Sequence, residues 1–184
     1  MRIISGQFRG RRLNAPRLPH TRPTTDFART ALFNILNHHW NLTSVRVLDL
    51  FAGAGSVALE FVSRGAVAVT AVDNDALCIR HLQRINAQWS LSNFQIVHAA
   101  VEQFLEHASG RYDIVFADPP HGYEGLQQLP DRILASGLLY PRGWLILETP
   151  RKVSFADHPT HFDQRQYGQI AFHFFSVPRS ISAG

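Results

Sequence analysis

Four carboxylates stand at or near the ends of short apolar runs, where they could together bind a positively charged ligand. These residues are Asp49, Asp73, Asp118 and Glu148. In an open α/β sheet, ligands bind in the crevice outside the carboxyl ends of the strands. We therefore expect several of these acids to line one crevice, although acids at such positions also cap the helices that follow strands.

A glycine loop follows the first of these runs and predicts a cofactor that contains adenosine. The segment Gly53-Ala54-Gly55-Ser56-Val57-Ala58 fits the pattern G-x-G-x-x-G/A, and Asp73 follows at about the spacing of a ribose-binding acid. A carboxylate at Asp49 disfavours a pyrophosphate and favours the sulfonium and amino groups of S-adenosylmethionine. We therefore expect this methyl donor, and an NAD-dependent oxidoreductase is the less favoured alternative.

The sequence Asp118-Pro119-Pro120 predicts where a substrate amine is held. Two consecutive prolines cannot continue a central strand, so the chain leaves the sheet and fixes the Asp118 carboxylate and nearby carbonyl groups at the crevice. Such acceptors suit an exocyclic NH2 group and assist its attack on a methyl sulfonium. A carboxylate also suits guanine, which presents N1–H beside N2–H. The alternative is that these prolines only end the strand.

Positive charge is concentrated at the N-terminus. Residues 1–29 contain seven arginines against Asp26 alone, whereas the rest of the chain has a small negative net charge. Of the 18 basic residues, 17 are arginine, whose planar guanidinium suits phosphate groups and stacking. This distribution predicts a nucleic-acid partner, with a solvated basic flap as the alternative.

Apolar periodicity predicts an α/β fold in which helices cover both faces of a parallel sheet. Expected strands span residues 45–49, 67–73, 94–98, 112–118 and 144–148, and expected helices span residues 56–63, 76–89, 101–107 and 125–134. Residues 1–20 predict an Arg-rich hairpin, and residues 26–37 an amphipathic helix that buries Phe27, Ala31, Leu32, Ile35 and Leu36. Residues 164–175 predict an antiparallel hairpin about Gly168 at the sheet edge. We expect a basic N-terminal extension over residues 1–37 and a Rossmann-like domain over residues 38–184.

Composition excludes several classes of protein. A chain of 184 residues with 45% hydrophobic residues can bury one core. The single cysteine, Cys78, excludes an intramolecular disulfide and a Cys-based zinc cluster, and we expect it to be buried. The ten histidines lack partners at ligand spacing, so no metal site is expected. No apolar run approaches the roughly 18–20 residues of a membrane span, and the N-terminus lacks a signal-peptide pattern, so we expect a cytoplasmic protein. We also expect a monomer.

Short motifs occur in a fixed order over nearly the whole chain. They are Arg2-Ile3-Ile4-Ser5-Gly6, Gly10-Arg11-Arg12, Arg22-Pro23-Thr24-Thr25-Asp26, Leu32-Phe33-Asn34, the loop from Asp49 to Gly55, Ser63-Arg64-Gly65-Ala66, Asp118-Pro119-Pro120 and Tyr167-Gly168. In this order the motifs resemble the RsmD family of small-subunit rRNA guanine-N2 methyltransferases. The resemblance implies a class I methyltransferase fold that binds S-adenosylmethionine and methylates N2 of a guanine. The implied substrate is small-subunit rRNA within an assembled or partly assembled ribosomal subunit.

The resemblance also implies roles for individual residues. The methionine end of the cofactor would contact Asp49, Phe51, Ala52, Gly53 and Gly55. Its ribose would contact Asp73, and its adenine would lie near Asn74 and Val101. The target amine would meet a catalytic motif of Asp118, Pro119, Pro120 and His121. The rRNA phosphates would contact Arg9, Arg11, Arg12 and Arg22.

Two positions depart from the family pattern. His121 stands where the family usually has Tyr or Phe, an aromatic platform for a base taken out of the stack, and Tyr123 is an alternative platform. The segment Ala99-Ala100-Val101 lacks the acid usual near the adenine amine, which leaves adenine recognition to Asn74 and to backbone groups near Val101. These departures keep two alternatives open. One is an RNA-binding protein of this fold with weak or lost catalysis, and the other is a methyltransferase for another nucleic-acid amine.

Overall fold

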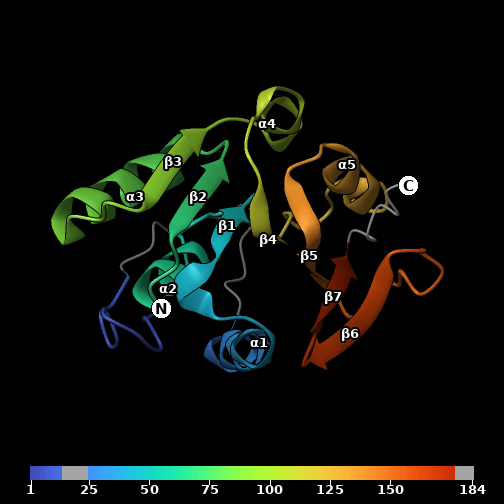
Figure 1. The fold of residues 1–184 in the computed structure, drawn as a ribbon, viewed down its shortest axis with the longest axis horizontal. Coiled ribbons are helices and arrows are strands. Elements are labelled where there is room, and N and C mark those ends of the chain that lie inside the picture. Colours follow the sequence, from blue (N-terminus) through green and yellow to red (C-terminus); the bar gives the residue numbers. More distant parts are fainter. Residues whose placement is uncertain (14–24, 177–184) are drawn as a thin grey trace, which may run out of the picture.

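The protein contains one seven-stranded sheet with strand order β3-β2-β1-β4-β5-β7-β6. The structure is a computed structural model that describes residues 1–13 and 25–176. The strands are β1 (Arg46–Asp49), β2 (Ala68–Asp73), β3 (Phe94–His98), β4 (Tyr112–Ala117), β5 (Leu139–Pro150), β6 (His161–Tyr167) and β7 (Ile170–Ser176). Strands β1 to β5 are parallel, and β7 pairs antiparallel with both β5 and β6. The predicted parallel sheet with a C-terminal antiparallel hairpin is confirmed, and Figure 1 shows this hairpin at the end of the sheet opposite β3.

Helices cover both faces of the sheet because successive strand residues point to opposite sides. The helices are α1 (Asp26–His39), the short 3-10 helix η1 (Leu42–Ser44), α2 (Ala58–Ser63), α3 (Ala76–Trp89), α4 (Val101–His107) and α5 (Leu129–Ala135). One core joins Val47 and its neighbours to α1, α2 and α3. The other core joins Leu48 and its neighbours to α4 and α5. None of the helices in the described residues is long and apolar enough to cross a bilayer.

Residues 1–13 form a looped segment that packs onto the first core. A single antiparallel bridge joins Arg2 to Arg12, so the segment contains no regular strands. Ile3, Phe8 and Leu13 are buried in the same core as α1, α2 and α3. The rest of the predicted hairpin over residues 1–20 lies outside the described residues.

A buried carboxylate ties this N-terminal segment to α2. Glu60 is buried, and its two oxygens accept hydrogen bonds from the backbone N–H groups of Ile4 at 2.7 Å and Ser5 at 3.0 Å. The side chain of Arg64 donates to Glu60 at 2.8 Å. These partners compensate the loss of hydration, since a buried charge is tolerated when it is paired and hydrogen-bonded.

The prediction that α1 buries Phe27 is wrong. Phe27 is 72% exposed, whereas the predicted Leu32 and Leu36 are buried and the predicted Ala31 and Ile35 are half-buried. The helix also buries Ala28, Arg29 and Phe33. Residues four apart lie on one face of a helix, so the face that contains Leu32 and Leu36 is directed at the core and Phe27 is directed away from it. Hydrophobic periodicity could not predict a buried arginine, whose guanidinium donates to the Arg2 carbonyl and to Asp26.

Several predicted boundaries also move. Helix α1 is two residues longer than expected, and α2 and α5 begin later than expected, at Ala58 and Leu129. Strand β5 extends from Leu139 to Pro150, so Glu148 lies inside the strand and does not end it. Asp118 is the residue that follows β4. The ends of helices and strands are the hardest feature to predict from sequence, because pairing with neighbouring strands decides where a strand stops.

Candidate cofactor and substrate site

Three carboxylates come from neighbouring strands at the carboxyl edge of the sheet. Asp49 ends β1, Asp118 follows β4, and Glu148 lies near the end of β5. These strands are adjacent, and the pairing of Ala117 with Leu147 sets Asp118 beside Glu148 in register. Asp49 is 1% exposed and Glu148 is 5% exposed. Acids that are far apart in the sequence therefore share one enclosed edge.

Burial and mutual repulsion disfavour the charged forms of these acids. Burial, together with the nearby Asp73 and Glu148, raises the pKa of Asp49 to about 7 although Ala58 N–H donates to it at 3.1 Å. Its other oxygen, Oδ1, is buried and has no hydrogen-bond partner in the part of the chain that the structure describes. Burial, Glu148 and Asp49 raise the pKa of Asp118 well above its ordinary value. A cation at this edge would relieve the repulsion, since opposite charges favour ionised carboxylates.

The glycine loop between β1 and α2 leaves space at one glycine and packs tightly at the other. Both Gly53 and Gly55 have positive φ angles, of 53° and 79°. A Cβ atom on Gly53 would meet nothing nearer than 4.0 Å, whereas one on Gly55 would lie 2.5 Å from Leu82 of α3. Gly55 is therefore required for packing, and Gly53 leaves open space on the surface of the loop.

Asp73 fixes the shape of this loop from the end of β2. Its Oδ2 accepts a hydrogen bond from Gly53 N–H at 2.7 Å, and its Oδ1 accepts one from Asp75 N–H at 2.8 Å. A carboxylate has about four lone-pair sites, so both oxygens keep capacity for further donors such as ribose hydroxyls. The backbone carbonyl of Asp73 also accepts from Ala99 N–H at 3.1 Å, which connects β2 to the segment before α4.

The residues predicted to lie near adenine gather at the same edge. Val101 is buried as the first residue of α4, and Asn74 is exposed just after β2. The His98 imidazole hydrogen-bonds the Asn74 carbonyl at 3.2 Å. Ala100 caps α4 without a side-chain hydrogen bond. The backbone that leads into α4 therefore lies beside the end of β2.

Tyr123 connects the glycine loop to α4 and α5, a link that the sequence did not indicate. Its ring meets Phe51 edge to face, with centroids 5.5 Å apart. Its hydroxyl donates to Glu102, which also lies 3.8 Å from Arg132. No local pattern marks Glu102, because its partners lie 21 and 30 positions away in the chain. His121, by contrast, is exposed.

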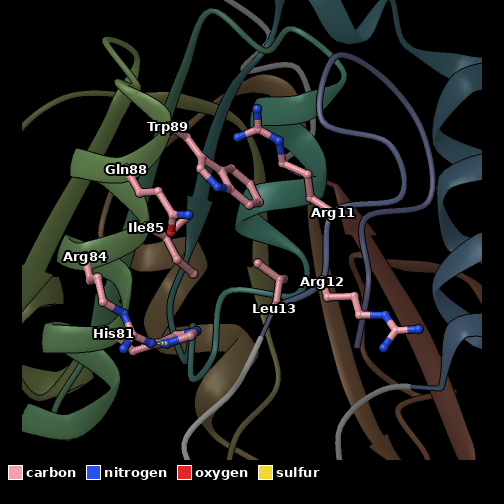
Figure 2. A pocket seen from close by; sticks show the side chains of 8 residues that line it. All are labelled: Arg11, Arg12, Leu13, His81, Arg84, Ile85, Gln88 and Trp89. Carbon is pink, nitrogen blue, oxygen red and sulfur yellow. Dashed lines mark hydrogen bonds between the residues drawn. The ribbon is translucent and has the colours of Figure 1, made fainter.

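The predicted RNA-binding arginines lie away from these acids. Arg9, Arg11 and Arg12 are exposed on the N-terminal segment, and Arg22 lies outside the described residues. A cavity of about 700 Å³ separates this segment from α3, as Figure 2 shows. None of the predicted cofactor or catalytic residues lines it.

Comparisons with known proteins agree over most of the chain. The family model described as Conserved hypothetical protein 95 matches residues 1–176. Ribosomal RNA small subunit methyltransferase D of Escherichia coli K12 is 30% identical over 178 residues, covering 95% of this chain and 89% of that protein. The protein of the same name from Buchnera aphidicola subsp. Baizongia pistaciae is 31% identical over 145 residues, covering 79% of this chain and 70% of that protein.

Solved structures share the fold. A hypothetical protein of Thermus thermophilus superposes with a TM-score of 0.85 at 32% identity, covering 96% of this chain and 99% of that chain. A protein solved in complex with SAH superposes with a TM-score of 0.61 at 19% identity, covering 72% of this chain and 45% of that chain, which supports the fold alone. A structure described as putative methyltransferase yhhF from Escherichia coli superposes with a TM-score of 0.83 at 29% identity, covering 97% of this chain and 98% of that chain. The sheet, with its terminal antiparallel hairpin, is thus that of class I methyltransferases. The match over residues 1–176 and the identity to these relatives show that the chain belongs to the RsmD family.

Proposed function

We propose that this protein transfers the methyl group of S-adenosylmethionine to the exocyclic N2 amine of a guanine in small-subunit rRNA. The observation that carries the proposal is the group of three carboxylates, Asp49, Asp118 and Glu148, at one edge of a methyltransferase sheet. Membership of the RsmD family supports the reaction and the rRNA substrate, since the relatives are named as small-subunit rRNA methyltransferases. The choice of guanine N2 rests on the acceptor chemistry of Asp118.

The residues at this edge fit the cofactor. When bound, S-adenosylmethionine supplies an electrophilic methyl group on a positively charged sulfur. The buried Oδ1 of Asp49 lacks a partner and would accept a hydrogen bond from the cofactor's cationic amino group. The open surface of Gly53 admits a ligand close to the backbone, and Asp73 has spare lone pairs for ribose hydroxyls. We assign adenine to the segment at Asn74 and Val101.

Asp118 performs the acceptor chemistry in this proposal. The amine nitrogen would form a bond to the methyl carbon as the carbon–sulfur bond of the sulfonium breaks with its electron pair left on sulfur. The nitrogen begins with two N–H bonds and would lose one proton, so each transfer would release a proton. An ionised Asp118 accepts hydrogen bonds from the guanine N–H groups and takes this proton. A cation held at this edge would favour the ionised form of Asp118 and of the neighbouring acids, because opposite charges lower the pKa of a carboxyl group. Pro119 and Pro120 hold the carboxylate by ending β4 rigidly.

We assign the wall of the base pocket to Tyr123 and place His121 at its rim. Tyr123 is held by Phe51 and Glu102, so its ring keeps one orientation before substrate arrives. The exposed imidazole of His121 is free to stack on a base that has left the RNA stack. His121 is smaller than the Tyr or Phe that the family usually has at this position, so we expect slower methyl transfer. The alternative is complete loss of catalysis, and the experiment below distinguishes the two.

We also propose that the protein acts as a monomer in the cytoplasm, on an assembled or partly assembled small ribosomal subunit. The exposed arginines Arg9, Arg11 and Arg12 support an RNA partner, because guanidinium groups bind phosphates bidentately.

The test is methyl transfer from labelled S-adenosylmethionine to small ribosomal subunits that lack this modification, with naked rRNA assayed in parallel. Digestion to nucleosides should yield N2-methylguanosine. Asp118→Ala should abolish incorporation while the affinity for S-adenosylmethionine changes less than about fivefold. The control Asp157→Asn alters an exposed acid outside the crevice and should keep full activity. Cofactor binding without incorporation at any pH would establish the RNA-binding alternative, and another methylated nucleoside would refute the choice of guanine N2.

A further inference from the structure

A cavity lies between the N-terminal segment and α3, and its lining contains none of the residues assigned to the proposed active site. It measures about 700 Å³ and is lined by Arg11, Arg12, Leu13, His81, Arg84, Ile85, Gln88 and Trp89. Figure 2 shows side chains from α3 on one wall and residues 11–13 on the other. Its volume lies within the range of small-molecule sites, roughly 300–1,000 Å³. The described residues of the lining are rich in hydrogen-bond donors and include no acid.

Three arginines of this cavity have no carboxylate partner. Within residues 1–13 and 25–176, no Asp or Glu lies within ion-pair distance of Arg11, Arg12 or Arg84. Other arginines, such as Arg64 on α2, do form ion pairs. Three uncompensated positive charges around one cavity attract anions, because like charges repel unless a counter-ion lies between them.

Aromatic rings hold the first of these arginines in place. Phe8 and Trp89 stack with centroids 4.8 Å apart, and the guanidinium carbon of Arg11 lies 4.9 Å from one ring centre and 5.0 Å from the other. Cation–π contact fixes the group while leaving its N–H groups available. A guanidinium that is already ordered loses less conformational entropy when it binds a phosphate.

His81 adds a buried donor that lacks an acceptor. The residue is 6% exposed, and Figure 2 shows its side chain extending from α3 toward Leu13. Arg84 lies 3.2 Å from His81 Nδ1, and because a guanidinium can only donate, Nδ1 must be the acceptor. A neutral imidazole then carries its proton on Nε2, which is buried and has no hydrogen-bond partner among residues 1–13 and 25–176. A buried donor without an acceptor costs stability, so an acceptor bound in the cavity would complete the arrangement.

We call this cavity between residues 11–13 and α3 the groove. We propose that the groove binds backbone phosphates of the rRNA strand that adjoins the target guanine, with Arg11, Arg84 and His81 as the principal donors. The inference rests on the proposed function, which supplies RNA as the ligand. Helix α3 begins three residues after Asp73, and Arg84 lies eight residues into it, so the groove is about 12 Å along the helix from the cofactor edge. One RNA strand can therefore contact both sites.

The test compares Arg84→Ala with Arg80→Ala. Both arginines are exposed on α3, one turn apart, and only Arg84 lines the groove. Binding of the full chain to naked small-subunit rRNA would be measured by filter retention between 50 and 300 mM KCl. Arg84→Ala should weaken binding about 10-fold near 150 mM salt, as for loss of a charge-assisted hydrogen bond. The slope of log K against log salt should fall by about 0.7–0.9, as for loss of one phosphate contact. Arg80→Ala should change affinity less than about threefold.

Other outcomes separate failure of the groove from failure of the proposed function. Equal effects of the two variants, or no effect of either, would refute the proposal that the groove binds rRNA phosphates. So would weaker binding of Arg84→Ala to whole subunits with unchanged binding to naked rRNA, since a ribosomal protein would then be the partner. If the wild-type chain methylates rRNA and Arg84→Ala binds normally, the function stands and the groove fails. If the wild-type chain never methylates rRNA while the Arg84-specific effect persists, the groove stands and the methyltransferase proposal fails.

Discussion

Replacing Asp49 by asparagine should stabilise the protein in the absence of cofactor at alkaline pH. Burial and neighbouring acids raise the pKa of Asp49 from 3.8 to about 7. Between these two values the folded chain holds one proton that the unfolded chain has released, so the free energy of unfolding falls as pH rises. Above pH 7 the full cost of ionising Asp49 in the folded protein is present. Asparagine stays neutral and removes this cost.

The expected size follows from the difference between the two pKa values. About three units correspond to about 4 kcal/mol at 1.36 kcal/mol per unit, which is an upper limit for the gain at pH 8. The asparagine carbonyl can keep the hydrogen bond from Ala58 N–H. Its NH2 group then takes the place of the oxygen that has no partner, and an unsatisfied buried donor costs about 1–3 kcal/mol. At pH 8 this donor cost leaves a net gain of about 1–3 kcal/mol for Asp49→Asn, and at pH 4, where Asp49 is also largely neutral, the same donor cost leaves a loss of up to about 1–3 kcal/mol.

Urea unfolding without cofactor, followed by tryptophan fluorescence at pH 4, 6 and 8, measures this difference. The control Asp157→Asn should track the wild-type chain at every pH. Asp49→Asn should also weaken binding of S-adenosylmethionine about 10- to 100-fold at pH 8, because a charge-assisted hydrogen bond is lost. A loss of stability at pH 8 that equals the loss at pH 4 would refute the electrostatic argument. Unchanged cofactor affinity would remove Asp49 from the cofactor site.

Three further predictions concern packing and histidine. Gly55→Ala should destabilise the fold by about 1–3 kcal/mol in urea unfolding, because its φ is positive and its Cβ would lie 2.5 Å from Leu82; a neutral effect would show that the loop shifts freely. Tyr123→Phe keeps the ring but loses the hydrogen bond to Glu102, and should cost about 1 kcal/mol in the same assay; an unchanged midpoint would deny that contact a role. Burial and His161 lower the pKa of His173 from 6.5 to about 4, so its neutral form stabilises the fold above pH 6.5 and this contribution is lost as pH falls toward 4. His173→Gln should flatten the acid-induced loss of stability between pH 6.5 and 4 by up to about 3 kcal/mol, and an unaltered pH profile would contradict this assignment.

The sequence by itself determined the order of elements and the family. Alternating apolar runs predicted the five parallel strands, and Gly168 marked the C-terminal hairpin, since both depend on residues close in the chain. The glycine loop and Asp118-Pro119-Pro120 were also visible as local motifs. Strand ends placed Asp49 and Asp118 at one edge, because parallel strands share the direction of their carboxyl ends.

Only the tertiary structure decided how these residues affect one another. The raised pKa values of Asp49 and Asp118 arise from burial and from acids on other strands. Helix α1 buried Arg29, whose guanidinium donates to the Arg2 carbonyl, and exposed Phe27, against the local apolar pattern. The groove that joins Arg11 to Arg84 needs segments about 70 positions apart to meet. Periodicity records which side of an element is apolar, whereas electric fields and cavities depend on which elements become neighbours, and long-range packing alone decides that.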